Sequence, residues 1–119
     1  MSVSPSYKAF VLEQISVSGA VTVKAMFGGV GLYCQGLFFG LIDDDTLYLK
    51  VDDATRADFE AIGSTPFQPY GDGSHVMQYY ELPAELLEDR EAVRPWVERA
   101  LGAARRKSFG KGKRTNTKR

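Results

Sequence analysis

Glycines cluster where this chain could hold a phosphate group: Gly28, Gly29 and Gly31 occur within four residues. A phosphate-binding loop needs GxxxxGK[ST] between a strand and a helix, because helix amides and a lysine hold the phosphates. Here the glycines lead into another apolar run, and no Lys-Ser or Lys-Thr pair follows them. We therefore expect Gly28-Gly29 to form a bend or bulge that lets strand and helix backbones approach, and no nucleotide cofactor.

The side chains best suited to nucleophilic or metal chemistry are scarce. Cys34 and His75 are the single cysteine and the single histidine of the chain, so neither a zinc site nor a Ser-His-Asp or Cys-His pair is expected. Cys34 lies in an apolar run without a neighbouring cation to stabilise a thiolate, which indicates a packed core cysteine. The sequence therefore predicts a protein that is not an enzyme and that binds no cofactor.

Carboxylates occur in two short clusters, at 43–45 and at 52–53. An EF-hand would place acids at alternate positions, followed by a glycine and a distal glutamate, and the chain lacks that pattern. We expect the first cluster to form a polar turn and the second to cap a helix. A weak Mg²⁺ site remains the minor alternative, and no metal site is predicted.

The last 15 residues hold eight Lys or Arg and no acid, whereas residues 1–104 hold seven Lys or Arg and all 15 acids, a net charge of −8. We divide the chain into a domain, 1–104, and a basic tail, 105–119, which should be disordered beyond about Lys107. Such tails bind polyanions without reading sequence, and Phe109 could stack on a base. The tail could instead aid solubility or fold back on acids at 43–45 or 85–91. Its candidate nucleic-acid-binding residues are Arg105, Arg106, Lys107, Phe109, Lys111, Lys113, Arg114, Lys118 and Arg119.

The first half of the chain reads as a helix followed by a meander. Ser4 and Pro5 predict the start of a helix over 5–16, ended by Ser18-Gly19. An extended segment over 21–34 follows, then a hairpin turn at Gln35-Gly36. In the strand 46–51, Leu47, Leu49 and Val51 share one face, and Tyr48 and Lys50 share the other.

The second half alternates helices and short strands. We expect a helix from Asp52 or Asp53 to Ile62, stopped by Gly63, then a short strand from Pro66-Phe67. A turn over 70–74 and a strand over 76–82 should follow, with a last helical region from Pro83. An apolar stripe there predicts that Trp96 is buried against the sheet, and Pro95 predicts a break or kink near Arg94.

These elements give the order α-β-β-β-α-β-β-α, with helices at both ends of an antiparallel sheet. That order indicates an α+β fold, a two-layer sandwich with one core. The chain shows no signal peptide, no apolar run long enough to cross a membrane, and one cysteine, which together predict a cytoplasmic protein.

The string MFGGVGLY with a later YLKV resembles the TfoX N-terminal domain family over residues 7–105. The structural motif is carried by Met26, Phe27, Gly28, Gly29, Gly31 and Tyr33, and further matches are Leu32, Leu47, Tyr48, Leu49, Lys50, Val51, Phe67, Tyr80, Leu82, Pro83 and Trp96. The resemblance implies a small bacterial α+β sandwich linked to competence and transcriptional regulation, with no catalytic residues to carry over. Longer competence regulators add a second helical domain, where this chain has its basic tail.

Two functions are compatible with these observations. The resemblance implies a regulatory module that acts through protein-protein contact. The basic tail favours the alternative, an accessory protein that binds DNA or RNA without sequence preference.

Overall fold

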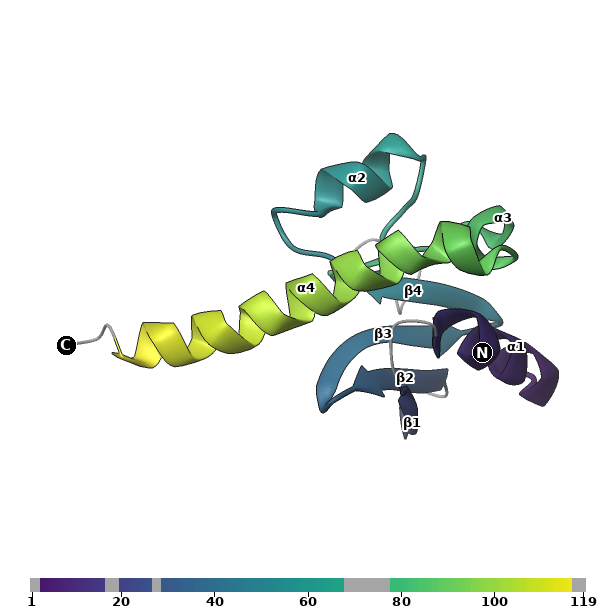
Figure 1. Ribbon diagram of the computed structural model, residues 1–119, viewed down its shortest axis with the longest axis horizontal. Helices are drawn as coiled ribbons and strands as arrows, with labels where there is room; N and C mark the ends of the chain where they lie inside the picture. The colour runs from purple at the N-terminus through teal and green to yellow at the C-terminus, as the bar shows by residue number, and fades with distance from the viewer. Residues whose placement is uncertain (1–2, 17–19, 27–28, 68–77, 117–119) are drawn as a thin grey trace.

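The computed structural model describes residues 3–16, 20–26, 29–67 and 78–116. Its elements are α1 (Pro5–Ile15), β1 (Thr22–Met26), β2 (Gly29–Cys34), β3 (Leu37–Asp43), β4 (Thr46–Lys50), α2 (Arg56–Ala61), β5 (Tyr79–Glu81), α3 (Ala84–Leu87) and α4 (Arg90–Asn116). The five strands form one antiparallel sheet in the order β1-β2-β3-β4-β5. Figure 1 shows α4 crossing the sheet, and α1 packs against α4. The α+β sandwich with terminal helices is confirmed.

Turn and cap residues produce the meander as predicted. The Ser4 hydroxyl accepts a hydrogen bond from the Tyr7 amide at 3.2 Å and begins α1. Gln35 and Gly36 have φ of 53° and 80°, and Asp44 and Asp45 have φ of 53° and 52°. Two consecutive residues with positive φ match the twist of a two-residue hairpin. The predicted turns at 35–36 and 43–45 are confirmed.

The predicted extended segment 21–34 is two strands. Met26 pairs with Gly29 and Thr22 with Tyr33, so β1 folds back on β2. A Cβ on Gly29 would lie 2.3 Å from the Ile42 carbonyl oxygen of β3. The prediction of a bend or bulge within one extended segment is therefore wrong. Gly29 belongs to β2, and it allows two strands to approach each other, not a strand and a helix.

The core lies between one face of the sheet and helices α1 and α4. Its fully buried side chains include Phe39, Ile42, Leu47 and Leu49 from the sheet, Val51 directly after β4, Val11 and Ile15 from α1, and Val93 and Val97 from α4. Gln14 links the helices, because its amide donates to the Leu87 carbonyl at 2.8 Å and accepts from Arg90 at 3.3 Å. The predicted division of β4 into two faces is confirmed.

The other face of the sheet carries a smaller aromatic cluster. Leu41, Phe67 and Tyr79 are buried there, against Phe38 and Tyr48. At the start of the strand predicted from Pro66-Phe67, Pro66 forms an isolated bridge to Tyr80, and the residues after Phe67 lie outside the described residues. Described residues of the predicted strand 76–82 form the short β5, and the predicted turn at 70–74 and helix stop at 18–19 lie outside the described residues.

The sequence predicts a break or kink near Arg94, and the break is wrong, because helix α4 is continuous past Pro95. The break comes earlier, between α3 and α4, where the Asp89 carboxylate accepts from the Glu91 and Ala92 amides. Pro95 and Glu91 are both exposed. Water can therefore satisfy the Glu91 carbonyl that the proline cannot pair.

Trp96 is half-buried and packs on α2, which corrects the prediction that it is buried against the sheet. Its ring meets Phe59 edge to face at 4.9 Å, and the Arg99 guanidinium lies 4.6 Å from it. Helix α4 also continues through Asn116, whereas the sequence predicts disorder beyond about Lys107. Once packing has nucleated a helix, each further residue adds a hydrogen bond at little cost.

Candidate functional site

Lys50, at the end of β4, is the one charged residue among the buried polar residues of the described part of the chain. Only 7 % of it is exposed. Lys50 pairs with Tyr79 of β5 in the sheet register, so both side chains lie on the face opposite the main core. The Lys50 ammonium donates to the Tyr79 hydroxyl at 3.5 Å and lies 4.8 Å from the centre of that ring.

The surroundings of Lys50 change the acidity of both partners. Burial lowers the pKa of the Lys50 ammonium, and the positive charge of Lys107 lowers it further, while Asp52 opposes the change. Burial raises the pKa of Tyr79 to about 12, with a further contribution from Tyr33. At neutral pH the Tyr79 hydroxyl therefore keeps its proton and can donate it in a hydrogen bond.

Two pockets meet at Lys50 and Lys107, and we call their union the lysine cleft. The larger, of about 360 Å³, opens between the β4–α2 turn and α4, and Asp52, Asp53, Arg56 and Arg106 contribute to its walls. The smaller, of about 290 Å³, has Leu37, Phe38 and Tyr79 among its walls. The cleft is thus polar on one side and largely apolar on the other.

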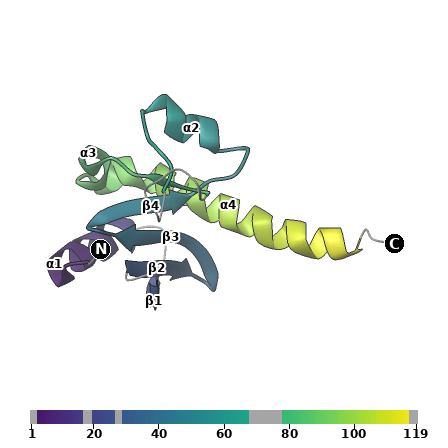
Figure 2. The same ribbon diagram turned by 180° about the vertical axis from the view of Figure 1, so that it is seen from behind.

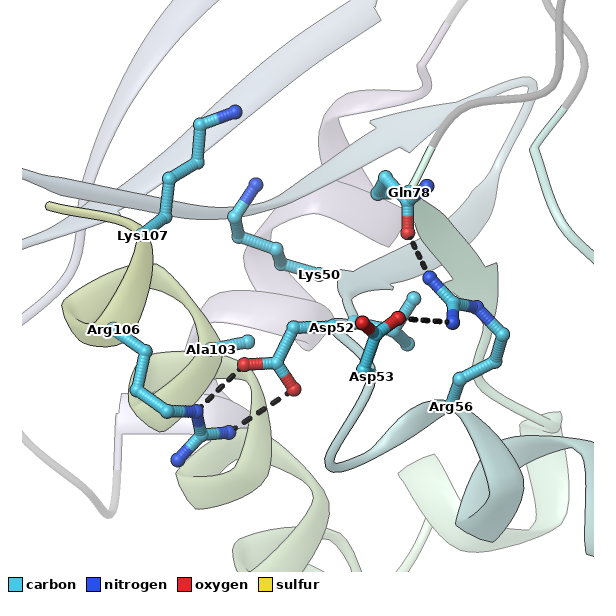
Figure 3. A pocket seen from close by; sticks show the side chains of 9 residues that line it. Lys50, Asp52, Asp53, Arg56, Gln78, Ala103, Arg106 and Lys107 are labelled. Atoms are coloured by element: carbon cyan, nitrogen blue, oxygen red, sulfur yellow. Dashed lines mark hydrogen bonds and ion pairs between the residues drawn. The ribbon is translucent and has the colours of Figure 1, made fainter. Parts of the chain in front are cut away.

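Both carboxylates of the cleft face arginines (Figure 3). Arg106 donates to the two oxygens of Asp52 at 2.6 and 3.1 Å, which holds the pKa of that carboxyl below its ordinary value. Arg56 donates to Asp53 at 2.8 Å and also bonds the Gln78 side chain. In the same view Lys50 and Lys107 extend their ammonium groups to one side of the cleft, away from these pairs.

Asp52 also shapes the turn before α2. Its carboxylate accepts from the Ala54 and Thr55 amides at 3.0 and 3.2 Å. Helix α2 starts only at Arg56, with Thr55 at its N-cap and no side-chain hydrogen bond that caps it. The predicted helix cap at Asp52 or Asp53 is therefore wrong, because Asp52 closes the turn before the helix. Gly63, with φ of 81°, follows the end of α2 as predicted.

The predicted nucleic-acid-binding residues divide into three groups. Arg105, Arg106 and Lys107 are exposed, and Arg106 also forms an ion pair with Asp52, which is not among the acids at 43–45 or 85–91 predicted for a folded-back tail. Lys118 and Arg119 lie outside the described residues. The remaining candidates, Phe109, Lys111, Lys113 and Arg114, belong to the last turns of α4.

The residues of the glycine motif that the structure describes have structural roles. Gly29 and Gly31 lie within β2, which leads through a hairpin into β3 and not into a helix, so the geometry of a phosphate loop is absent at these residues. Tyr33 stacks on Phe38 at 5.1 Å. Phe27 and Gly28 lie outside the described residues.

Other chemistry-bearing residues behave as follows. Cys34 is a buried free thiol in the core. His75 lies outside the described residues. No group of three or more His, Cys, Asp or Glu within the described ranges is arranged to hold a metal ion, and none of the described helices is long and apolar enough to cross a membrane.

Sequence reasoning placed Lys50 on the correct face of β4 but did not single it out as a site residue. Its burial depends on Tyr79, which is 29 residues away, and on α4, which is farther still. In a strand whose apolar residues alternate with other residues, a lysine at an alternate position normally indicates that this face of the strand meets solvent. No local signal distinguishes this lysine from an exposed one.

The fold and the cleft define a small α+β domain in which one long helix crosses an antiparallel meander. A family model described as the TfoX N-terminal domain matches residues 13–104, and the chain belongs to this family. The match ends where the basic segment 105–119 begins. No individual curated protein matches the chain.

Proposed function

We propose that this chain is a non-enzymatic regulatory module that acts in transcriptional regulation by contacting a protein partner. Membership of the TfoX N-terminal domain family supports this function through the competence regulators with which the family is associated. The observation that carries the proposal is the β1 edge of the sheet, which no other described strand covers and which can offer backbone hydrogen bonds to an extended partner segment.

The two edges of the sheet differ. At the β5 edge the chain covers itself, because the Phe67 amide donates to the Tyr79 carbonyl at 2.7 Å and the Glu81 amide donates to the Thr65 carbonyl at 3.0 Å. At the other edge, β1 pairs only with β2 among the described residues. Residues 22–25 are all exposed. An edge of this kind is a template for strand addition.

Side chains on β1 suggest what the partner offers. Val23 is 41 % exposed and is one of two large apolar side chains that stand out on the described surface. Lys24 sits in the middle of the strand, where a charge discourages indiscriminate pairing of edges. The partner segment that fits best is therefore extended, with an apolar residue near Val23 and an acid near Lys24.

The test is to capture partners from a nuclease-treated lysate with the wild-type chain and two variants. Val23→Lys adds a second charge to the β1 edge and should abolish capture. Ile62→Lys is the matched control, because Ile62 is 38 % exposed but follows α2, and capture should persist. Capture that survives Val23→Lys, or that both variants lose equally, would contradict the β1 contact.

A second candidate function is nucleic-acid binding by the basic segment 105–119. It is favoured by the course of α4, which leaves the body and carries residues 105–116 outward (Figures 1 and 2). The segment holds eight cations and no acid, and cations of this density attract phosphates by counterion release. Nuclease treatment separates the two functions, since capture through nucleic acid would be lost from all three proteins.

A further inference from the structure

We propose that the lysine cleft binds a phosphate monoester, with Lys50, Lys107 and the Tyr79 hydroxyl as donors to the phosphate. The site is formed by β4, β5 and the middle of α4. It is independent of the β1 edge, so the proposal stands or falls without the proposed protein contact.

Lys50 has unused hydrogen-bonding capacity in a buried position. An ammonium group can donate three hydrogen bonds, and its single hydrogen bond within the described residues is the long one to Tyr79, at 3.5 Å. None of the described carboxylates forms an ion pair with it. A buried cation without a paired anion is costly, so natural proteins rarely keep one unless a ligand or solvent satisfies it. Lys50 lines both pockets of the cleft, where a ligand can reach it.

Lys107 adds a second positive charge to the same space. Its charge opposes protonation of Lys50, which places the two ammonium groups within electrostatic reach of each other. Like charges held together are relieved by an anion bound between them. Figure 3 shows both ammonium groups directed to one side of the cleft, clear of the two arginine–aspartate pairs.

The charge of the cleft matches a dianion. Lys50, Arg56, Arg106 and Lys107 against Asp52 and Asp53 leave a net charge of +2 on the larger pocket. Because Asp52 and Asp53 are bound to arginines, the uncompensated charge belongs to the two lysines. A phosphate monoester carries about −1.5 to −2 at pH 7, whereas a phosphodiester of a nucleic-acid backbone carries a single charge.

Tyr79 and the smaller pocket define the rest of the ligand. Because burial raises the pKa of Tyr79 to about 12, its hydroxyl accepts from Lys50 and still has a proton to donate to a phosphate oxygen. Phe38 lies 5.3 Å from the Tyr79 ring, and with Leu37 it forms an apolar wall beside the charged groups. The organic part of the monoester therefore lies on this wall, which favours a flat or aromatic group.

The test is a titration of the full-length ¹⁵N-labelled chain, followed by NMR, with methyl phosphate, dimethyl phosphate and phenyl phosphate. We expect saturable shifts at Lys50, Tyr79 and Lys107 with both monoesters. Phenyl phosphate should bind several-fold more tightly than methyl phosphate, because it adds apolar contact. Dimethyl phosphate should bind at least about tenfold more weakly, because it lacks the second charge.

Three variants locate the site. Lys50→Met and Lys107→Gln should each weaken methyl phosphate binding about tenfold or more, the loss expected for one charge-assisted hydrogen bond. Lys24→Gln removes the same charge from exposed β1 and should leave binding unchanged. Lys50→Met replaces a buried charge with an apolar chain of similar length, so a well-dispersed spectrum is expected; if it does not fold, Lys107→Gln carries the test.

A direct titration of the Lys50 side chain gives an independent measurement. The pKa of Lys50 should lie below the ordinary lysine value in the free protein and rise when methyl phosphate saturates the site, because a bound anion favours the charged form. Four results would overturn the proposal: no saturable shift at Lys50, equal binding of dimethyl phosphate, an equal loss in Lys24→Gln, or an unchanged pKa at saturation.

Discussion

At the residue scale, Lys50 and Tyr79 show how one register pair creates both a buried cation and a buried phenol. The two residues face each other across β4 and β5, and each is less than a tenth exposed. Burial favours the neutral form of each group, so it lowers the pKa of Lys50 and raises that of Tyr79. The acidity of the pair is therefore a property of the sheet.

We predict that the protein loses stability at alkaline pH because of Tyr79. Its pKa is about 12 in the folded chain against 10.0 in the unfolded chain, so its contribution is complete below pH 10 and is lost as pH rises toward 12. The loss amounts to about 2–3 kcal/mol. Urea denaturation from pH 8 to 12 measures it, and Tyr79→Phe should flatten the curve in that window. Identical pH profiles for the two proteins would contradict the assignment.

A second prediction at this scale concerns Gly29. A Cβ at this position would lie 2.3 Å from the Ile42 carbonyl oxygen, a backbone atom that cannot move aside without distorting β3. Gly29→Ala should therefore lower the free energy of unfolding by about 1–3 kcal/mol, the usual cost of overpacking.

Gly102→Ala provides the opposite control in thermal or urea denaturation. Gly102 lies inside α4, and its nearest new contact would be the flexible end of Arg106, at 3.4 Å. Alanine is the better helix former there, so a gain of up to about 1 kcal/mol is expected. If Gly29→Ala proves as stable as the wild type, the close approach of β2 and β3 is not what requires the glycine.

At the element scale, α2 is held against α4 by aromatic and charged side chains. Phe59 is fully buried and meets Trp96 edge to face, while Arg99 lies over the Trp96 ring and also pairs with Asp58 at 3.0 Å. This contact joins the crossover segment between β4 and β5 to the helix that crosses the sheet. Trp96 therefore joins two helices and does not fill the sheet interface.

We predict that Trp96→Ala costs about 2–3 kcal/mol, less than the 3–5 kcal/mol typical of a fully buried aromatic, because Trp96 is only partly buried. Phe59→Ala should cost about 3–5 kcal/mol. The double variant should show a coupling of about 0.5–1.5 kcal/mol, as aromatic pairs do. Denaturation followed by circular dichroism measures all three proteins, and additive losses would show that the two rings do not act together.

At the scale of the whole molecule, charge is separated along the chain. The body, 1–104, carries −8 and the segment 105–119 carries +8. Helix α4 spans both parts, with buried residues up to Ala104 and exposed cations immediately after it. One of the eight cations, Arg106, is used to hold α4 to Asp52. A duplex would thus meet a basic segment on an acidic body that repels it.

If this segment binds DNA, affinity should be insensitive to sequence and should fall steeply with salt. Contacts to five to eight phosphates imply a log–log slope of about −4 to −7 between 50 and 300 mM salt. Removal of residues 108–119 takes away five of the eight cations and leaves Arg106 and Lys107 in place. Fluorescence anisotropy with a labelled duplex should then detect no binding at physiological salt. Equal affinity of the two chains would end the nucleic-acid hypothesis for this segment.

The sequence by itself determined what depends on neighbouring residues. The Ser4 cap, the turns at 35–36 and 43–45, the alternation in β4 and the apolar stripe of α4 each lie within a few residues, and the structure confirms them. Together with the glycine-rich motif, they were sufficient to predict the α+β sandwich and the family.

Only the tertiary structure decided the features that depend on distant residues. Gly29 makes a tight contact with Ile42 across two strands, and Trp96 found its partner in Phe59, 37 residues before it. Pro95 is tolerated because its face of α4 meets water. The lysine cleft arose in the same way, since Lys50 becomes a buried cation only when β5 and α4 close around it. Local pattern fixes which face a side chain takes, but burial and charge depend on what the rest of the chain places opposite that face.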